Sequence, residues 1–321
     1  MVKDNVDLSV VIPIYNNAAF IPILIEEIAS SLDGLVMSYE LIFIDDRSPD
    51  NAWEALADVA ATHNYIKAIR LNRNSGQHIA LAAGIRESEG KWVLTMDGDM
   101  QDHPKDIARF WQKAQEGRDI VLAYYDIENR SALRSACNKA FAKCLSLVSQ
   151  ETIAPNIGSM TLFSRKVADA YCQFDEPYRH HLHILYWLQF DIGYTEYTKH
   201  EQTHDTSGYD LKKLINHAID GLFLYSTNLL YLVIIIGVML MFIASLLGAY
   251  ALFHFIFYSP TSGWTSLVLL IISMSGLIIC SIGVVGIYIV KIFKQTQNRP
   301  LYIVDESINC QSGRTHGTYS L

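Results

Sequence analysis

The feature that most constrains this sequence is a long stretch without formal charge. From Gly221 to Val290 the chain holds no Asp, Glu, Lys or Arg. A folded soluble domain keeps a polar face on its surface helices and does not leave so long a stretch uncharged. Two apolar runs within it, at about 229–258 and 264–293, each exceed the roughly 20 residues that cross a bilayer. The sequence therefore predicts a transmembrane hairpin.

The charges that flank the predicted hairpin indicate its orientation. They precede the first span and follow the second, whereas the connecting turn has none: Lys212, Lys213, Lys291, Lys294 and Arg299. By the positive-inside rule, both termini and the large N-terminal part lie in the cytoplasm, and the protein lies in the cell membrane. The sequence shows no signal peptide at its start.

The segments around the hairpin complete the predicted domain organisation. Residues 1–206 form one domain, and residues 295–321 form a short polar tail after a membrane region at 225–294. Residues 207–224 carry apolar side chains at helical spacing, which is typical of a helix lying in the membrane interface. An ordinary packing helix would show the same spacing, and the position beside the first span favours the interface.

The overall composition excludes some classes of function. The net charge of −8 argues against a nucleic-acid partner. The five cysteines are scattered and form no paired motif, which indicates reduced thiols and no cysteine metal site.

The first domain alternates short apolar runs with segments of helical periodicity. This alternation predicts a mainly parallel α/β sheet covered by helices on both faces. The expected strands are 8–14, where Pro13 is expected to end the strand, then 39–44, 66–71, 91–96, 119–124 and a short one at 157–163. Helices are expected between them, with Ser48 or Asp50 as the N-cap of the second.

Polar side chains gather at the carboxyl ends of four of these strands. They are Tyr15 and Asn16, Asp45 and Asp46, Asn74 and Gln77, and Asp97 and Asp99. The carboxyl ends of parallel strands form the ligand-binding edge of such a sheet, so this set predicts a nucleotide-like pocket. Tyr15 is suited to lie against a base. No glycine-rich phosphate motif is present, which favours a divalent cation as the partner of the phosphates.

The stretch from Thr95 to Asp102 carries the most chemistry. In an extended segment alternate side chains share a side, so Asp97, Asp99 and Gln101 are expected to face the same way. Two carboxylates and an amide oxygen suit Mg²⁺ or Mn²⁺ carrying a diphosphate. A solvated acidic turn is the alternative for this short motif taken alone.

Two later clusters are less specific. Arg130 and Arg134 are four residues apart and share a helix face, which suits an acceptor phosphate or a solvated basic surface. Three histidines lie within Arg179–His183. Neighbouring histidines point apart on a helix, which favours packing or surface roles over zinc binding.

Taken together, these blocks resemble inverting glycosyltransferases of family 2 with the GT-A fold, in the polyprenyl-phosphate branch. The resemblance rests on Val10–Asn16, Phe43–Asp50, Leu71–His78, Thr95–Asp102, Ser164–Val167, His204–Tyr209 and the predicted hairpin. The sequence departs from the family pattern at Asn17, Ser159, Thr161, Gln202 and Asp205, of which Thr161 and Gln202 stand where an arginine is usual. Relatives of this kind suggest a homo-oligomer.

The resemblance implies roles for individual residues. Nucleotide-sugar binding falls to Pro13, Tyr15, Asn16, Asp45, Asp46, Asn74, Gly76, Gln77 and Asp97, and metal binding to Asp97, Asp99 and Gln101. The catalytic set is Asp97, Asp99 and Asp102. The acceptor phosphate is assigned to Arg130, Arg134, Arg165, Ser207 and Tyr209.

The expected activity is transfer of a sugar from a UDP- or GDP-sugar to a polyprenyl phosphate, with inversion and with Mg²⁺ or Mn²⁺ as cofactor. The first alternative is a membrane-tethered transferase acting on a lipid-linked saccharide or polymer, in which Asp102 would be an essential base. The second is a non-catalytic membrane scaffold with a degenerate transferase domain.

Overall fold

A computed structural model describes residues 6–35, 38–124, 157–176, 180–197, 264–297 and 299–310, and a few single residues from 239 to 257. The chain divides into two compact units. The first comprises residues 1–130, 153–206 and 299–321, and the second comprises 131–152 and 207–298.

The first unit is built on an eight-stranded sheet in the order β7-β5-β6-β4-β1-β2-β3-β8. β6 and β8 run antiparallel to their neighbours, whereas the other pairings are parallel. The strands are β1 Leu8–Ile14, β2 Tyr39–Asp45, β3 Ile66–Leu71, β4 Trp92–Thr95, β5 Ile120–Tyr124, β6 Ile157–Ser164, β7 Ile192–Glu196 and β8 Val304–Ile308. The predicted mostly parallel α/β sheet is confirmed.

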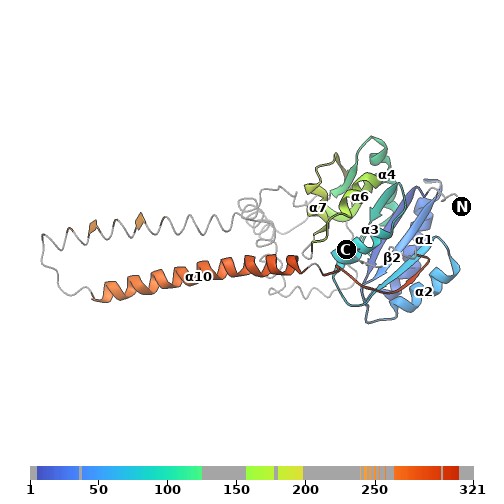
Figure 1. Cartoon of the computed structure of the whole chain (residues 1–321). Helices are drawn as coiled ribbons and strands as arrows, with labels where there is room; N and C mark the ends of the chain where they lie inside the picture. Colours follow the sequence, from blue (N-terminus) through green and yellow to red (C-terminus); the bar gives the residue numbers. More distant parts are fainter. Residues whose placement is uncertain are drawn as a thin grey trace. The chain divides into compact units, whose positions relative to one another are not determined.

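Two layers of helices cover the sheet (Figure 1). One layer holds η1 Ala18–Phe20, α1 Ile21–Leu32, α2 Ala52–Thr62, η2 Pro104–Asp106 and α4 Ile107–Gln115. The other holds α3 Gln77–Glu87, α6 Arg165–Tyr171 and α7 His181–Trp187. Pro13 does not end β1, because it pairs in register with Ile44 and the strand continues to Ile14. Proline is disfavoured within a central strand because it lacks an N–H donor, but so near the strand end only one ladder bond is lost.

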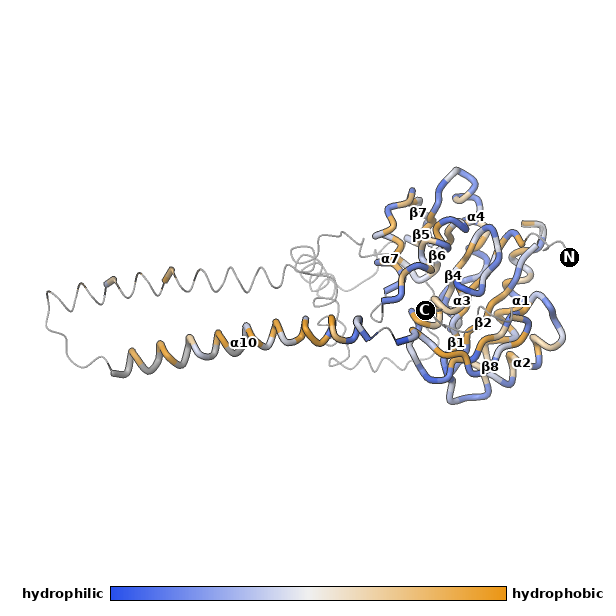
Figure 2. Tube along the Cα trace, in the orientation of Figure 1, coloured by the Kyte–Doolittle hydropathy of each residue, from blue (hydrophilic) through white to orange (hydrophobic). Residues whose placement is uncertain are grey.

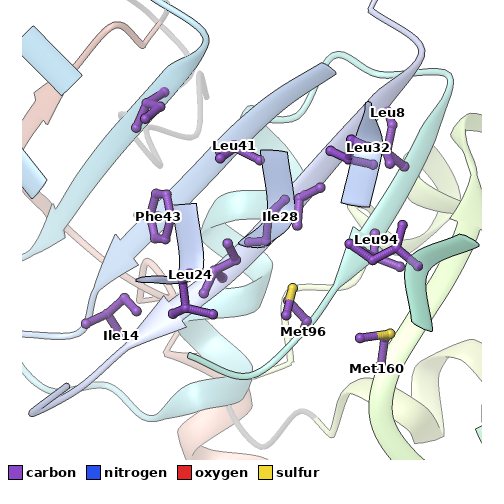
Figure 3. Close-up of a cluster of buried hydrophobic side chains, with 14 of the residues drawn as sticks. Leu8, Ile14, Leu24, Ile28, Leu32, Leu41, Phe43, Leu94, Met96 and Met160 are labelled. Carbon is purple, nitrogen blue, oxygen red and sulfur yellow. The ribbon is translucent and has the colours of Figure 1, made fainter. Parts of the chain in front are cut away.

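The core forms because alternate strand residues point to opposite faces. Val10 and Ile12 face α1 and α2, whereas Val11 faces α3. Figure 3 shows Leu24 and Ile28 of α1 among the labelled core side chains of the strands. Burying one such side chain contributes about 1.5–3 kcal/mol, so this helix is held to the sheet by its apolar stripe.

The segment after residue 298, expected to be a polar tail, contributes to the sheet. β8 pairs with the outer edge of β3, and Leu301 and Tyr302 are buried beside α3 and α6. The Asn72 amide donates to the Ile303 carbonyl at 2.9 Å. A single amphiphilic strand of five residues carries too weak a pattern to be recognised among polar residues.

The second unit contains α10, Trp264–Thr296, over the range predicted for the second span. Figure 2 shows apolar residues along most of α10. Its side chains are described only in part, and several large ones are exposed, including Leu267, Ile278 and Ile282. Taken over the described residues alone, no helix is long and apolar enough to cross a membrane. The predicted first span and interface helix lie largely or wholly outside the described residues.

Candidate active site

The carboxyl ends of β1, β2, β3 and β4 meet at one edge of the sheet because these strands are mutually parallel. The loops that follow them therefore lie together, and several hydrogen bonds join one loop to the next. The structure thus brings together loops that carry residues predicted for the nucleotide pocket: Asn16 is linked to Ser48, Gly76 to Asp46, and Gln77 to Asp97.

The loops after β1 and β2 are tied by two side chains that we predicted as helix caps. Ser48 Oγ accepts a hydrogen bond from the Asn16 amide at 3.2 Å, and Asp50 Oδ2 accepts one from the Ala18 amide at 2.9 Å. The N-cap of α2 is Asn51, which makes no side-chain capping bond. The capping prediction is wrong, because these groups serve the neighbouring loop instead of their own helix.

Asp46 holds the loop between β3 and α3 through two hydrogen bonds. Its carboxylate accepts hydrogen bonds from the Ser75 and Gly76 amides, both at 2.7 Å, and it is almost fully buried. Burial raises the pKa of Asp46, and the two amide bonds oppose that shift. With both oxygens engaged, Asp46 fixes the loop that leads into α3, where Gly76 has a φ of +92°. Asn74 and Gln77 are exposed on this loop.

Asp45 is different, since only one of its oxygens has a hydrogen bond. Oδ1 accepts the Ser48 amide at 2.9 Å. Oδ2 is buried and has no hydrogen-bond partner among the described residues, with Arg70 Nε at 3.5 Å. Oδ2 and Arg70 Nε therefore form an ion pair without a hydrogen bond, so Oδ2 keeps the capacity to accept an N–H group from a ligand. Tyr15, in the loop after β1, is 50% exposed.

The loop after β4 carries the candidate metal ligands, but it is a turn and not an extended segment. Met100 has a φ of +63°. The turn lets the Gln101 backbone and side-chain amides donate to Asp99 at 3.1 and 2.6 Å. Gln77 donates to Asp97. The predicted alternation is wrong, and the turn is what places Gln101 against Asp99.

Asp97, Asp99 and Gln101 form a suitable set of ligands for a hard cation. Both carboxylates are partly exposed, and among the described residues the hydrogen bonds to Asp99 come from neutral amides alone. Carboxylate and amide oxygens are what Mg²⁺ and Mn²⁺ prefer. The residues present therefore fit a divalent cation.

The side chain of Asp102 is fully buried and accepts hydrogen bonds from the Asp97 amide at 2.8 Å, from Ser159 Oγ at 3.0 and 3.1 Å, and from the Tyr197 hydroxyl. Burial raises the pKa of Asp102, and it likewise raises the pKa of Tyr197. These bonds hold Asp102 under the loop that carries Asp97 and Asp99, and its contact with the substrate stays a prediction.

Thr161, which stands where the resemblance leads us to expect an arginine, belongs to a buried hydrogen-bonded network. Thr161 Oγ1 lies 2.7 Å from Thr95 Oγ1 and 2.9 Å from His181 Nε2. His181 Nδ1 lies 3.1 Å from the Tyr171 hydroxyl. His181 is thus a packed residue of α7, as the spacing of the histidines indicated.

The acceptor residues are the part of the predicted site that is not assembled. Arg165 lies at the opposite edge of the sheet, because β6 runs antiparallel to β4, and its guanidinium donates to the Gly90 carbonyl and to Ser88 Oγ. Arg165 is therefore a structural residue and not a phosphate ligand. The others lie outside the described residues: Arg130, Arg134, Ser207 and Tyr209.

Three residues near the site had not been predicted. Ser159 and Tyr197 hold Asp102, and Arg70 faces Asp45. Tyr197 follows β7, a strand whose alternation is too short to be recognised. Only pairing across the sheet identifies these contacts.

Gly98 gives a test of how closely the metal-binding loop must pack. A Cβ atom there would lie 2.9 Å from the Pro13 carbonyl oxygen and 2.5 Å from Ile14 Cδ1. Gly98→Ala is expected to displace the loop and lower kcat about 10-fold or more, since a misplacement of about 1 Å can cost roughly 100-fold. Steady-state kinetics measure this, with Gly283→Ala as control because its Cβ meets no atom of the described residues within 4 Å. Unchanged kcat would contradict the required packing.

The family model matches about half of the chain, and two curated relatives align with most of it. Residues 9–172 match the model of glycosyl transferase family 2. The SfII prophage-derived bactoprenol glucosyl transferase of Shigella flexneri is 29% identical, over 94% of this chain and 98% of that protein. The undecaprenyl-phosphate 4-deoxy-4-formamido-L-arabinose transferase of Photorhabdus laumondii is 28% identical, over 94% of each chain.

Among solved structures, the mannosyltransferase PcManGT from Pyrobaculum calidifontis, in complex with GDP-Man and Mn²⁺, has a TM-score of 0.49 and 15% identity, covering 69% of this chain and 64% of that one.

Proposed function

The chain belongs to glycosyl transferase family 2, and from this membership we propose that it transfers a sugar from a nucleotide-diphosphate sugar to a polyprenyl phosphate. The observation that supports the proposal is that Asp45, at the end of β2, and Asp97 and Asp99, in the loop after β4, lie at the same edge of the sheet. The two relatives named above act on bactoprenol and on undecaprenyl phosphate, and both align with nearly the full chain.

The donor would lie across the loops after β1, β2 and β4. The unbonded Oδ2 of Asp45 supplies an acceptor for a base N–H, and Tyr15 supplies an exposed ring for stacking. Asp97, Asp99 and Gln101 would hold Mg²⁺ or Mn²⁺ near the diphosphate. When bound, such a cation neutralises the charge that grows on the departing nucleoside diphosphate.

The reaction is a displacement at the anomeric carbon. A phosphate oxygen of the lipid forms the new carbon–oxygen bond, while the bond from that carbon to the nucleotide's β-phosphate oxygen breaks and its electron pair leaves with the nucleoside diphosphate. The configuration at carbon is inverted. A phosphate is already ionised near neutral pH, so no strong base is required.

The hydrogen bonds to both carboxylate oxygens of Asp102 support the phosphate acceptor over a saccharide acceptor. A sugar hydroxyl must lose a proton as it attacks, and a positioned base contributes about 10²–10⁴-fold to such a step. Asp102 was the residue predicted for that task, yet it is fully buried and bonded to Ser159 and Tyr197. A lipid phosphate needs no such residue.

We also propose that residues 229–258 and 264–293 form a membrane hairpin, with the catalytic domain and both termini on the cytoplasmic side of the cell membrane. The uncharged stretch and the exposed apolar side chains of α10 support it. A lipid acceptor is confined to the membrane, so an anchored enzyme meets it readily. Packing of hairpins from several copies would give the expected homo-oligomer.

A product assay tests the function. Full-length protein in detergent is mixed with undecaprenyl phosphate, Mg²⁺ or Mn²⁺, and a panel of UDP- and GDP-sugars, and the lipid fraction is analysed by mass spectrometry. We expect one donor to give a lipid-monophosphate sugar, and EDTA to abolish it. Nucleotide binding without lipid product from any donor would instead support the saccharide-acceptor or scaffold alternatives.

A further inference from the structure

β8, the strand that follows α10 in the chain, is the last strand of the sheet and is linked through Arg70 to Asp45 of the candidate donor site. β8 pairs antiparallel with β3, and Glu306 stands opposite Arg70. Asn309 fixes the far end of the strand by donating to the Ala60 and Ile66 carbonyls at 2.7 and 2.8 Å. The strand is therefore firmly placed beside β3, whose Arg70 faces Asp45.

Two acidic residues of β8 pair with two arginines next to the donor loops. Glu306 Oε1 lies 3.3 Å from Arg70 Nη1, and Asp305 pairs with Arg47. The register shifts between Arg70 and Leu71, so that Asp305 has no opposite residue on β3. An irregularity of this kind changes the direction of a side chain. It explains how Asp305 and Glu306, which are consecutive and would point to opposite faces of a regular strand, both pair with arginines.

Arg70 is shared between Glu306 and the buried Asp45. Its Nη1 is bonded to Glu306, while its Nε stays 3.5 Å from Asp45 Oδ2 and has no hydrogen-bond partner among the described residues. Its guanidinium also lies over the Trp53 ring, 5.7 Å from the centroid. Glu306 and Trp53 thus hold Arg70 just short of a hydrogen bond with Asp45.

We propose that Glu306 is a positioning residue for donor binding, which restrains Arg70 so that the carboxylate of Asp45 stays available to the nucleotide base. Without the charge of Glu306, Arg70 moves onto Asp45 Oδ2 and takes the acceptor that the base N–H requires. Asp305 supports the same restraint, because its ion pair with Arg47 holds the loop that directly follows Asp45. The proposal depends on one part of the proposed function, namely that this site binds a nucleotide.

The test compares binding of nucleotide with binding of pyrophosphate, by calorimetry on full-length protein in detergent. Glu306→Gln is expected to weaken UDP or GDP binding about three- to fivefold, the range of an exposed ion pair. Pyrophosphate has no base, so its affinity is expected to stay the same. In steady-state assays the donor KM rises and kcat is unchanged. A purely structural role for β8 would change the melting temperature without changing the ratio of the two affinities.

Two further variants complete the test. Asp191→Asn removes an equally exposed acid paired with Arg118 at the far end of the sheet and is expected to leave both affinities unchanged. In an Arg70→Ala background, Glu306→Gln is expected to have no additional effect. Nucleotide binding by Glu306→Gln within about twofold of wild type, or an equal loss for pyrophosphate, would overturn the inference. Failure of the wild type to bind either nucleotide would instead contradict the proposed function.

Discussion

Replacing Asp99 with asparagine is expected to lower kcat by at least about 100-fold, the scale of losing one group that stabilises developing charge. The side chain is partly exposed and its bonds are to Gln101 in the same turn. Asparagine keeps the size of the side chain and one acceptor oxygen but removes the charge that would hold a divalent cation. The effect on the free energy of unfolding is therefore expected to be small.

Two measurements separate chemistry from folding. Lipid product is counted by mass spectrometry at saturating donor across a range of Mn²⁺ concentrations, and the melting temperature is recorded for the same samples. Asp191→Asn, which also removes one exposed carboxylate, is the matched control. Turnover by Asp99→Asn close to that of the wild type would show that the metal assignment is wrong.

The sheet and the donor loops were predictable because their signals are local. The strands from β1 to β5 are apolar runs between turn residues, and the polar residues after them fall at one edge as soon as the strands are parallel. The Asp-Gly-Asp motif was recognisable for the same reason. Its geometry was not, since the positive φ of Met100 and the closeness of Gly98 to Pro13 depend on packing against β1.

The contacts that decide the roles of individual carboxylates could not be predicted from the sequence. Asp46 and Asp102 resemble ligand-binding acids in sequence, yet both are buried because of partners that are distant along the chain. Arg165 was misplaced because the antiparallel direction of β6 carries its end to the opposite edge. The alternation of strands and helices predicted the parallel strands, but nothing in the residues of β6 indicated that this strand runs antiparallel.

Asp102→Ala is expected to abolish activity and to destabilise the protein by about 3 kcal/mol or more, because it leaves a cavity and removes the acceptor of three buried or partly buried donors. The Asp97 amide, Ser159 and Tyr197 would all lose their partner. The loop that carries Asp97 and Asp99 is then no longer held from below. Thermal or urea unfolding of the full-length protein measures the loss of stability.

Asp102→Asn distinguishes a positioning role from a catalytic one. Asparagine keeps the volume and one carbonyl acceptor, and the hydroxyls of Ser159 and Tyr197 can accept as well as donate. A positioning residue is therefore expected to retain activity within about 10-fold, whereas loss of a general base costs about 10²–10⁴-fold. A loss in that larger range, in a variant that melts like the wild type, would favour the saccharide acceptor and its essential base.

The pH dependence of stability provides an independent check on the same residue. Burial raises the pKa of Asp102 above its ordinary value of 3.8. As the pH rises from that value through the raised pKa, the unfolded chain releases a proton that the folded protein retains, so stability falls. Asp102→Asn removes this group, and its stability relative to the wild type is expected to increase over the same interval. A constant difference between the two proteins would mean that Asp102 titrates alike in both states, as an exposed carboxylate would, and that its buried placement is incorrect.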